Sequence, residues 1–380
     1  MALESTRESG LPSTDYYAPN YKIEVEGVEL DPESKGDVLD LKVVMDMENM
    51  TSFELTVNNW DDKTLSFKYS DTPTFDIGNR VHVQMGYADR ILSMVVGQIS
   101  SLSPKFPESG PPTLAISGLD GMLQLRDSKP AEGETKKYEG MADWEIAQAV
   151  ASRNGLKAEV TQEGEVHDLV IQKNQDDAQF LKERAARSDR DCFVLTDPGT
   201  GEDTLFFVKP LDGREDSRTR VYVFEWGKTL MNFNPKLTLS RQVAKVTVRG
   251  WNPRTKQAIF YTATPADLPG ATSGGTSGPQ AAEDNLKGKQ DVVVDAPIAT
   301  EQEAKDLAIS LLRERAYEFI TGAGQVIGLP DLRPGDNVEL QGLGQRFTGQ
   351  YYVKKVEHTL NNSGYLTNFE VRRVFDGGTE

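Results

Sequence analysis

The chain has 380 residues, which is more than one ordinary hydrophobic core accommodates, so we expect two to four domains. Hydrophobic residues make up 37% and charged residues 27%, as in soluble folded proteins, and the net charge of -17 disfavours binding to nucleic acid or to anionic membranes. Cys192 is the single cysteine, so no internal disulfide can form. The three histidines, His82, His167 and His358, are too scattered for a zinc site.

The sequence predicts neither a secretory leader nor a membrane span. The N-terminal stretch MALESTRESGLPSTDYY lacks an apolar core of signal-peptide length. No run approaches the roughly 20 apolar residues that a membrane helix needs. We therefore expect synthesis in the cytoplasm, without a signal peptide and without export by the general secretory route.

The first part of the chain has the alternating apolar pattern of β-strands. YKIEVEGVEL and SFELTVNN place every second residue on one apolar face, and RVHVQMGY, LSMVVGQISSL and PTLAISGLD continue the pattern. Glycine and proline separate the runs. Closely spaced strands with such turns predict a barrel or a sandwich over residues 20–125, after an N-terminal extension of residues 1–19.

The pattern changes near Asp127, and residues 126–234 are predicted to form a separate α+β unit. DWEIAQAVASRNG has a helical apolar face and ends at Asn154-Gly155, a common helix stop. The segment CFVLT, the turn DPGTGED and the segment TLFFVKP predict a hairpin.

The segment QKNQDDAQFLKERAARSDRDCFVL, residues 172–195, predicts a helix capped by Asn174 and followed by a strand. Cys192 lies past the C-terminal end of the helix, where the dipole does not stabilise a thiolate, so we expect a buried structural thiol. The basic residues of the helix could form an anion site. Because acidic residues alternate with them, a solvated and salt-bridged face is the interpretation we favour.

Strands return in residues 235–380, with two interruptions. LPGATSGGTSGPQAAED is rich in Gly, Ser and Thr and predicts a flexible loop over residues 268–282. Thr300-Glu301-Gln302-Glu303 is a capping box and predicts a helix over residues 301–320.

An internal repeat connects the two β regions. DIGNRVHVQ, residues 76–84, and RPGDNVELQ, residues 333–341, share a glycine, an Asn or Asp and an alternating strand. A glycine that opens a second strand follows each copy, in GQISSL and in GQYYVKKV. The predicted turn residues of the repeat are Gly78, Asn79, Gly97, Gly335, Asp336 and Gly349. The alternative is two unrelated β-hairpins, which often look alike.

The sequence contains no motif for a catalytic site, a metal site or a cofactor site. No dinucleotide-binding fingerprint follows a strand, and neither a phosphate-binding loop nor a G-x-S-x-G elbow is present. Carboxylates are too abundant to identify an acid pair. We therefore predict no catalytic residue, no metal and no cofactor, and a structural protein rather than an enzyme.

The collinear order of these segments resembles the phage late-control D family, the baseplate hub of contractile tails. The resemblance extends from about Tyr21 to Arg373, and its most specific parts are residues 176–194 and 334–373. The chain is also similar to the hub part of type VI secretion spike proteins and to hubs of extracellular contractile injection systems. By this resemblance, the fold is mainly β with two tube-like β-barrel domains, residues 20–125 and 235–380, beside the α+β domain.

The resemblance implies a hollow homotrimer that adapts a hexameric inner tube to a trimeric spike. Three chains would present six barrels to the tube, and the helix of residues 301–320 would lie across the second barrel. The expected partners are the tube protein, a separate spike protein, and baseplate wedge or sheath components. The chain would be incorporated into the baseplate of a phage tail or of an injection-system particle.

Two alternatives differ in class from the hub. The first is a spike-associated cell-wall hydrolase, which would need a deep pocket with convergent carboxylates. The second is a monomeric peptidoglycan-binding or carbohydrate-binding module built around residues 126–234. Phage tails and injection systems both use such hubs, so the resemblance is to both.

Overall fold

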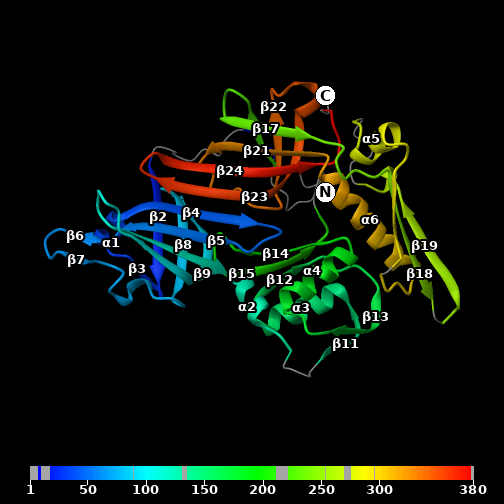
Figure 1. Cartoon of the computed structure of the whole chain (residues 1–380), viewed down its shortest axis with the longest axis horizontal. Helices are drawn as coiled ribbons and strands as arrows, with labels where there is room; N and C mark the ends of the chain where they lie inside the picture. Colours follow the sequence, from blue (N-terminus) through cyan, green and yellow to red (C-terminus); the bar gives the residue numbers. More distant parts are fainter. Residues whose placement is uncertain are drawn as a thin grey trace, which may run out of the picture.

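The computed structural model describes residues 18–88, 90–130, 135–210, 221–252, 254–268, 275–294 and 296–377, and the backbone of residues 7–9. These residues are mainly β. Figure 1 shows two adjoining β regions, one drawn in blue and cyan and one mainly in orange and red, with a mixed helix and strand region below them. A smaller sheet with a long helix lies at the end of the molecule away from the blue region. Among the described helices, none is both long and apolar enough to span a membrane.

The first β unit consists of the strands between residues 19 and 120. Its strand order is β3-β2-β8-β9-β10-β5-β4, with every neighbouring pair antiparallel. Its elements are β2 (Pro19–Val25), β3 (Val28–Glu29), α1 (Pro32–Gly36), β4 (Val38–Asp46), β5 (Ser52–Asn58), β6 (Trp60–Asp61), β7 (Ser66–Phe67), η1 (Pro73–Phe75), β8 (Arg80–Tyr87), β9 (Arg90–Lys105) and β10 (Thr113–Asp120).

The second β unit is continuous with the first, because β4 of the first unit pairs with β23 of the second. Its order is β16-β22-β23-β24-β21-β17, and β1 pairs in parallel with β16 at the edge. Its elements are β1 (Arg7–Ser9), β16 (Val221–Glu225), β17 (Asn232–Leu237), β21 (Ile320–Ile327), β22 (Asn337–Gln341), α7 (Gly344–Phe347), β23 (Gly349–Asn361) and β24 (Gly364–Arg373).

In its described residues, the middle unit contains two small sheets and three helices. β11 pairs with β13, and β15 lies between β12 and β14. The elements are α2 (Met122–Asp127), β11 (Lys136–Ala142), α3 (Asp143–Arg153), β12 (Lys157–Val160), β13 (Val166–Gln172), α4 (Asp177–Arg187), β14 (Asp191–Thr196) and β15 (Asp203–Val208). β14 and β15 form the hairpin that the sequence predicts around the turn DPGTGED.

The fourth region, called here the outer sheet unit, is a three-stranded sheet of order β19-β18-β20, covered on one face by α6. Its elements are β18 (Lys245–Asn252), β19 (Gln257–Ala263), η2 (Pro265–Asp267), α5 (Gly278–Asn285), β20 (Gln290–Val293) and α6 (Glu301–Tyr317). Val246, Val248 and Ile259 of the strands are buried and belong to one core cluster with Ala304 and Ala308 of α6.

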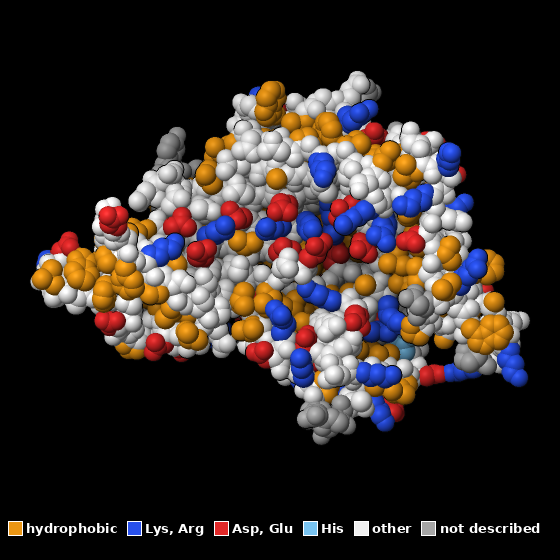
Figure 2. All heavy atoms as spheres, in the orientation of Figure 1, with side chains coloured by type: hydrophobic (Ala, Val, Ile, Leu, Met, Phe, Trp, Pro, Cys, Tyr) orange, Lys and Arg blue, Asp and Glu red, His pale blue; other side chains and the backbone are white. Residues whose placement is uncertain are grey.

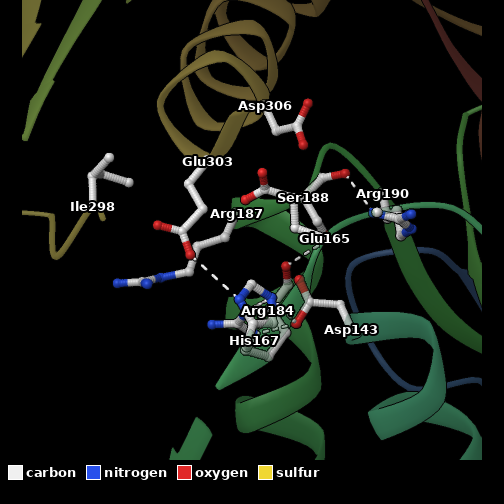
Figure 3. A pocket seen from close by; sticks show the side chains of 11 residues that line it. Asp143, Glu165, His167, Arg184, Arg187, Ser188, Arg190, Ile298, Glu303 and Asp306 are labelled. Atoms are coloured by element: carbon white, nitrogen blue, oxygen red, sulfur yellow. Dashed lines mark hydrogen bonds and ion pairs between the residues drawn. The ribbon is translucent and has the colours of Figure 1, made fainter. Parts of the chain in front are cut away.

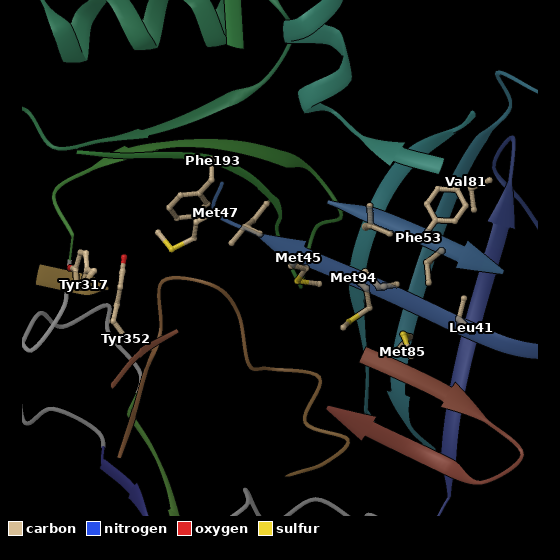
Figure 4. Packing of buried hydrophobic residues seen from close by; sticks show 14 of the residues in the cluster. Leu41, Met45, Met47, Phe53, Val81, Met85, Met94, Phe193, Tyr317 and Tyr352 are labelled. Atoms are coloured by element: carbon tan, nitrogen blue, oxygen red, sulfur yellow. The ribbon is translucent and has the colours of Figure 1, made fainter. Parts of the chain in front are cut away.

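The largest hydrophobic cluster runs from the first β unit into the regions beside it. Figure 4 shows Leu41, Met45 and Phe53 packed inside the first unit, with Phe193 of β14 and Tyr317 of α6 further along. Burying such side chains contributes about 1.5–3 kcal/mol each. The shared cluster ties the first β unit to the middle and outer sheet units.

The sheets do not follow the predicted domain boundaries at two places. β16 falls in the predicted middle unit, residues 126–234, but pairs with β22 of the second β unit. β18, β19 and β20 fall in the predicted second barrel, residues 235–380, but form their own sheet. The helix predicted over 301–320 is α6, which ends at Tyr317 and packs against β18 and β19, with few contacts to β24.

The flexible loop predicted over residues 268–282 is wrong at its C-terminal end. α5 begins at Gly278, where the side chain of Ser277 accepts a hydrogen bond from the backbone N–H of Gln280 and Pro279 occupies the first turn. These are ordinary helix-start signals. Leu268 is buried, and residues 269–274 lie outside the described part of the chain.

Candidate functional site

The repeated turn has the same backbone geometry in both β units. Gly78 and Gly335 have φ angles of 91° and 92°. Gly78 N–H donates to Ile99 O at 2.8 Å, and Ile99 N–H donates to Asn79 O at 3.0 Å. In the second unit, Gly335 N–H donates to Val353 O at 2.9 Å, and Val353 N–H donates to Asp336 O at 2.9 Å. The predicted turn residues Gly78, Asn79, Gly335 and Asp336 therefore occupy matching positions.

A β-bulge also recurs one residue beyond this contact. Between β9 and β10, Ile99 pairs with Gly118 and Ser101 pairs with Ser117, so Ser100 is skipped. Between β23 and β24, Val353 pairs with Val371 and Lys355 pairs with Glu370, so Lys354 is skipped. Bulges bend a strand at a defined place. The same turn and the same bulge at the same spacing support a repeat better than two unrelated hairpins would.

The two remaining glycines of the predicted repeat are not equivalent. Gly97 pairs with Val81 across β8 and β9, whereas the residue that pairs with the matching Val338 is Tyr351. Gly349 pairs instead with Leu340. Gly97 therefore corresponds to Tyr351, and Gly349 lies two residues before that position. The turn hydrogen bonds fix the strand register, and the presence of a glycine in both segments does not.

Alanine at either turn glycine should destabilise the protein to a similar degree. An L-residue at a φ near +90° is strained, and we expect each of Gly78→Ala and Gly335→Ala to cost about 1–2 kcal/mol. Urea unfolding of the two variants measures this. A large loss at one glycine with none at the other would contradict their equivalence.

The junction between the two β units is held by paired strands and by buried polar contacts. β4 and β23 pair from Asp46↔Lys355 to Asp40↔Asn361. Arg90 donates to both carboxylate oxygens of Asp331, at 2.8 and 2.7 Å, and the Asp331 side chain is buried. The hydroxyl of Tyr87 donates to Gly328 O at 2.8 Å. These contacts fix the orientation of the two repeated hairpins relative to each other.

His358 lies inside the same junction and is uncharged. Its Nε2 lies 3.3 Å from Leu332 O, and its Nδ1 lies 3.0 Å from the Tyr365 hydroxyl. A carbonyl can only accept, so Nε2 carries the proton and Nδ1 accepts. Burial, with the nearby Arg333 guanidinium, holds the pKa of His358 well below its usual value. His358 is therefore a structural group of the core.

Helix α4 begins later than the sequence predicts. Asp176 is its cap and accepts a hydrogen bond from Gln179 N–H at 2.7 Å, whereas Asn174 has a φ of 46° and lies in the preceding turn. The basic side chains of this segment mostly contact protein groups. Lys182 donates to Glu48 O of the first β unit, and Arg190 donates to Glu163 O. The segment connects units and is more than a solvated face.

A cluster of charged side chains joins the middle unit to α6 (Figure 3). His167 of β13 lies between Glu303 Oε1, 3.3 Å from Nδ1, and Asp143 Oδ1, 3.5 Å from Nε2. Arg184 Nε donates to Asp143 Oδ1 at 2.6 Å, and its Nη2 lies 2.8 Å from His167 Nε2. The adjoining cavity measures about 30 Å³, which is room for roughly one water.

The two carboxylates determine the protonation of His167. Hydrogen bonds to Asp143 and then to Glu303 raise the pKa of His167 to about 9, although burial and Arg184 oppose protonation. The pKa of Asp143 is lowered, because its contacts with His167 and Arg184 outweigh its burial. His167 therefore links β13 to the start of α6 through its contacts with the two carboxylates.

Stability should fall with rising pH in a window set by His167. A pKa raised in the folded state adds stability that is complete below the unfolded pKa of about 6.5 and is lost as pH rises through about 9. We expect a loss of about 3 kcal/mol over this window. His167→Gln should flatten the profile, as measured by urea unfolding at several pH values. An unchanged slope in this variant would contradict the assignment.

Cys192 is buried, as the sequence predicts. It packs in the core of the middle unit, while the next residue, Phe193, packs in the larger cluster on the other side of β14. Burial raises the pKa of the Cys192 thiol to about 12. The thiol is therefore protonated at neutral pH and is unsuited to nucleophilic attack.

Native Cys192 should not react with a thiol reagent such as Ellman's reagent within minutes. In urea it should react completely, because unfolding exposes the thiol and restores its ordinary pKa. A Cys192→Ser/Ser101→Cys variant, whose thiol lies at an exposed position, is the positive control. Rapid reaction of the native wild-type chain would contradict a buried thiol.

One groove contains the carboxylates that a hydrolase would need. Its volume is about 480 Å³, and Asp120 and Asp203 line it. Burial raises the pKa of Asp120 to about 7 and also raises that of Asp203. Asp120 already accepts hydrogen bonds from the backbone N–H groups of Thr51 and Met122, and Asp203 accepts one from the Thr196 hydroxyl. Both carboxylates thus anchor the surrounding chain.

Across the described ranges, no group of three or more His, Cys, Asp or Glu side chains is arranged to hold a metal ion. The sequence did not reveal the charged cluster around His167, since its members come from four separate elements. The capping box was the one local signal that pointed to a member of this cluster. Thr300 caps α6, and the Glu303 carboxylate of the same box contacts His167.

Comparisons with known proteins give a family match and a shared fold. The family model described as "Alg8 N-terminal domain" matches residues 16–362. No curated protein matches the chain. Among solved structures, the 43 kDa tail protein of prophage MuSo2 from Shewanella oneidensis has a TM-score of 0.69 and 14% identity, covering 94% of this chain and 98% of that chain.

Two further structures have the same fold. The tail protein from Neisseria meningitidis MC58 has a TM-score of 0.67 and 14% identity, covering 94% of this chain and 97% of its own. An E. coli component of the type VI secretion system is described as structurally similar to the T4 bacteriophage tail proteins gp27 and gp5. It has a TM-score of 0.57 and 12% identity, and the match covers 92% of this chain and 76% of that chain. The chain therefore has the fold of these tail proteins.

Proposed function

The chain belongs to the family described as the Alg8 N-terminal domain, whose model matches residues 16–362, and we propose that it is a structural baseplate hub of a contractile injection machine. The family description names a domain and states no activity. The proposal therefore rests on the tail-protein fold and on the architecture of the two β units.

The repeated hairpin is the observation that carries the proposal. Each chain has two copies of one turn, with φ angles of 91° and 92°, followed by the same bulge. A homotrimer of such chains would present six similar hairpins around one axis. One face of the trimer could then meet a hexameric tube, while its true threefold symmetry meets a trimeric spike.

The junction supplies the rigidity that this role requires. Six hairpins match a sixfold partner only if the two copies within each chain keep a fixed orientation. β4–β23 pairing and the contact of Arg90 with the buried Asp331 hold them in place. In this proposal the hub binds the tube, a separate spike protein, and wedge or sheath components, and it becomes part of a phage tail or an injection-system particle.

The role asks for stable interfaces and no reaction, so we propose a non-enzymatic protein. The hydrolase alternative would use Asp120 and Asp203, and the binding-module alternative would use the middle unit. Both are less well supported, because the solved structures that share the fold are described as tail or secretion-system proteins. A relationship of this chain to the late-control D family is also part of what we propose.

Sedimentation equilibrium of the purified chain tests the trimer. We expect a trimer at micromolar concentration, since obligate interfaces bury about 2,000 Å² or more. A chain that stays monomeric at all accessible concentrations, with or without tube and spike proteins, would contradict the hub. Hydrolysis of peptidoglycan that is lost in Asp120→Asn and Asp203→Asn variants would favour the hydrolase.

A further inference from the structure

The outer sheet unit has one face covered by α6 and one face exposed. β18, β19 and β20 place alternate residues on the exposed face, and their register brings Phe260 beside Arg249 and Val292 beside Thr247. Trp251 is 57% exposed and Phe260 is 71% exposed. Exposed aromatic and aliphatic side chains clustered on one sheet face are typical of an interaction surface.

This face is also basic. Arg249 lies in its centre, Lys245 lies at one end of β18, and Lys256 lies in the β18–β19 turn. Among the described residues, no acidic side chain lies on this face in the strand register, because Asp291 of β20 faces α6 and pairs with Arg315. Figure 2 shows hydrophobic and basic side chains together over the region where Figure 1 places β18 and β19.

A complementary surface lies at the opposite end of the molecule. In the first β unit, Val28 of the β2–β3 hairpin is 70% exposed, and Ile77 before the repeated turn is 67% exposed. The two segments adjoin, since Glu26 N–H donates to Arg80 O. Glu26, Glu29 and Asp76 are exposed beside these apolar side chains. Lys22 pairs with Glu24 and Glu29 here, but Glu24, Glu26, Glu29 and Asp76 together outnumber the neighbouring bases Lys22 and Arg80. This surface therefore combines apolar groups with a net negative charge, and it matches the outer sheet face in both respects.

We propose that the exposed face of β18–β19–β20 binds the acidic β2–β3 surface of a second copy of this chain. Two different surfaces at opposite ends of one subunit make a head-to-tail contact, which generates a closed trimer when successive copies are rotated by a third of a turn. The contact sets a basic aromatic face against an acidic one, and such charge complementarity favours this orientation of the two copies. The inference rests on the proposed trimer and names the surfaces that would form it.

A charge-reversal cycle tests the contact. Arg249→Glu should weaken self-association by about tenfold or more, because it places like charges opposite each other. Glu29→Lys should weaken it similarly. The double variant Arg249→Glu/Glu29→Lys should return association to within about threefold of wild type. Sedimentation velocity over a concentration series measures the self-association of all three variants. Circular dichroism checks that each variant is folded, and Arg249→Ala replaces Arg249→Glu if the latter does not fold.

A tryptophan pair gives a matched control for the aromatic part of the face. Trp251→Ser should weaken association by about tenfold, since buried interface aromatics dominate binding energy. Trp226 is 61% exposed and lies outside the outer sheet unit, so Trp226→Ser should leave association unchanged. A wild-type trimer that persists in both Arg249→Glu and Trp251→Ser would overturn this interface and leave the hub intact. A wild-type chain that never self-associates would overturn both.

Discussion

Replacing Gly97 with alanine should be among the most damaging single changes in this chain. A Cβ at this position would lie 2.3 Å from the backbone oxygen of Leu119 and 2.8 Å from its carbonyl carbon. Backbone atoms within a paired strand cannot move aside without breaking the β9–β10 ladder. We expect a loss of about 3 kcal/mol or more in the free energy of unfolding, or a failure to fold.

The matched control for Gly97→Ala is Gly36→Ala. Gly36 ends α1 and has no positive φ. Apart from its chain neighbours and the backbone of its own helix, no heavy atom lies within 4 Å of a Cβ placed there. This variant should be neutral or slightly stabilising, because alanine lowers the entropy of the unfolded chain. Urea unfolding compares the two. Equal stability of Gly97→Ala and Gly36→Ala would show that the close approach of β9 and β10 is not real.

Removing Arg90 should weaken the junction between the two β units. Arg90→Met takes a bidentate guanidinium away from Asp331, whose side chain is only 5% exposed. Breaking a buried ion pair by removing one partner typically costs about 3–5 kcal/mol. Because Arg90 itself is partly exposed, we expect about 2–4 kcal/mol, measured by urea unfolding.

A second ion pair in the same junction serves as the control for Arg90→Met. Lys42 lies 2.7 Å from Glu357, and both side chains are more exposed than that of Asp331. Lys42→Met should therefore cost about 1 kcal/mol or less. If the two variants lose the same stability, burial of Asp331 is not what makes the Arg90 contact important.

Local patterns in the sequence predict many of the elements. Alternation in YKIEVEGVEL and RVHVQMGY predicts β2 and β8, and the capping box at Thr300 predicts the start of α6. The repeated turn was visible because Gly78 and Gly335 both satisfy a φ near +90° that few other residues accept. In each case a short-range steric or hydrogen-bonding rule acts within a few residues.

Long-range relations could not be predicted in this way. The parallel pairing of β16 with β22 joins residues more than a hundred positions apart, and nothing local to Val221–Glu225 indicates it. Equating Gly97 with Gly349 failed because a residue letter does not report strand register. α5 was missed although Ser277 and Pro279 are start signals, because the Gly and Ser content of the segment before them dominated the interpretation.

The same division between short-range and long-range features holds for the residues of the candidate site. The turn residues of the repeat could be predicted, whereas the contacts that orient the repeats could not. Arg90 and Asp331 are separated by 241 positions, and His167 meets Asp143 and Glu303 only in the folded chain. Charge alone gave no guide to these pairs, because acidic and basic residues are common throughout the sequence.

Electron cryo-microscopy of the purified, self-associated chain tests the hub most directly, because it shows the number and arrangement of the β units. The account predicts a hollow particle with true threefold symmetry, in which six similar hairpins, two from each chain, surround the axis. A particle with a different number of chains, or a trimer whose two β units lie at clearly different distances from the axis, would contradict it.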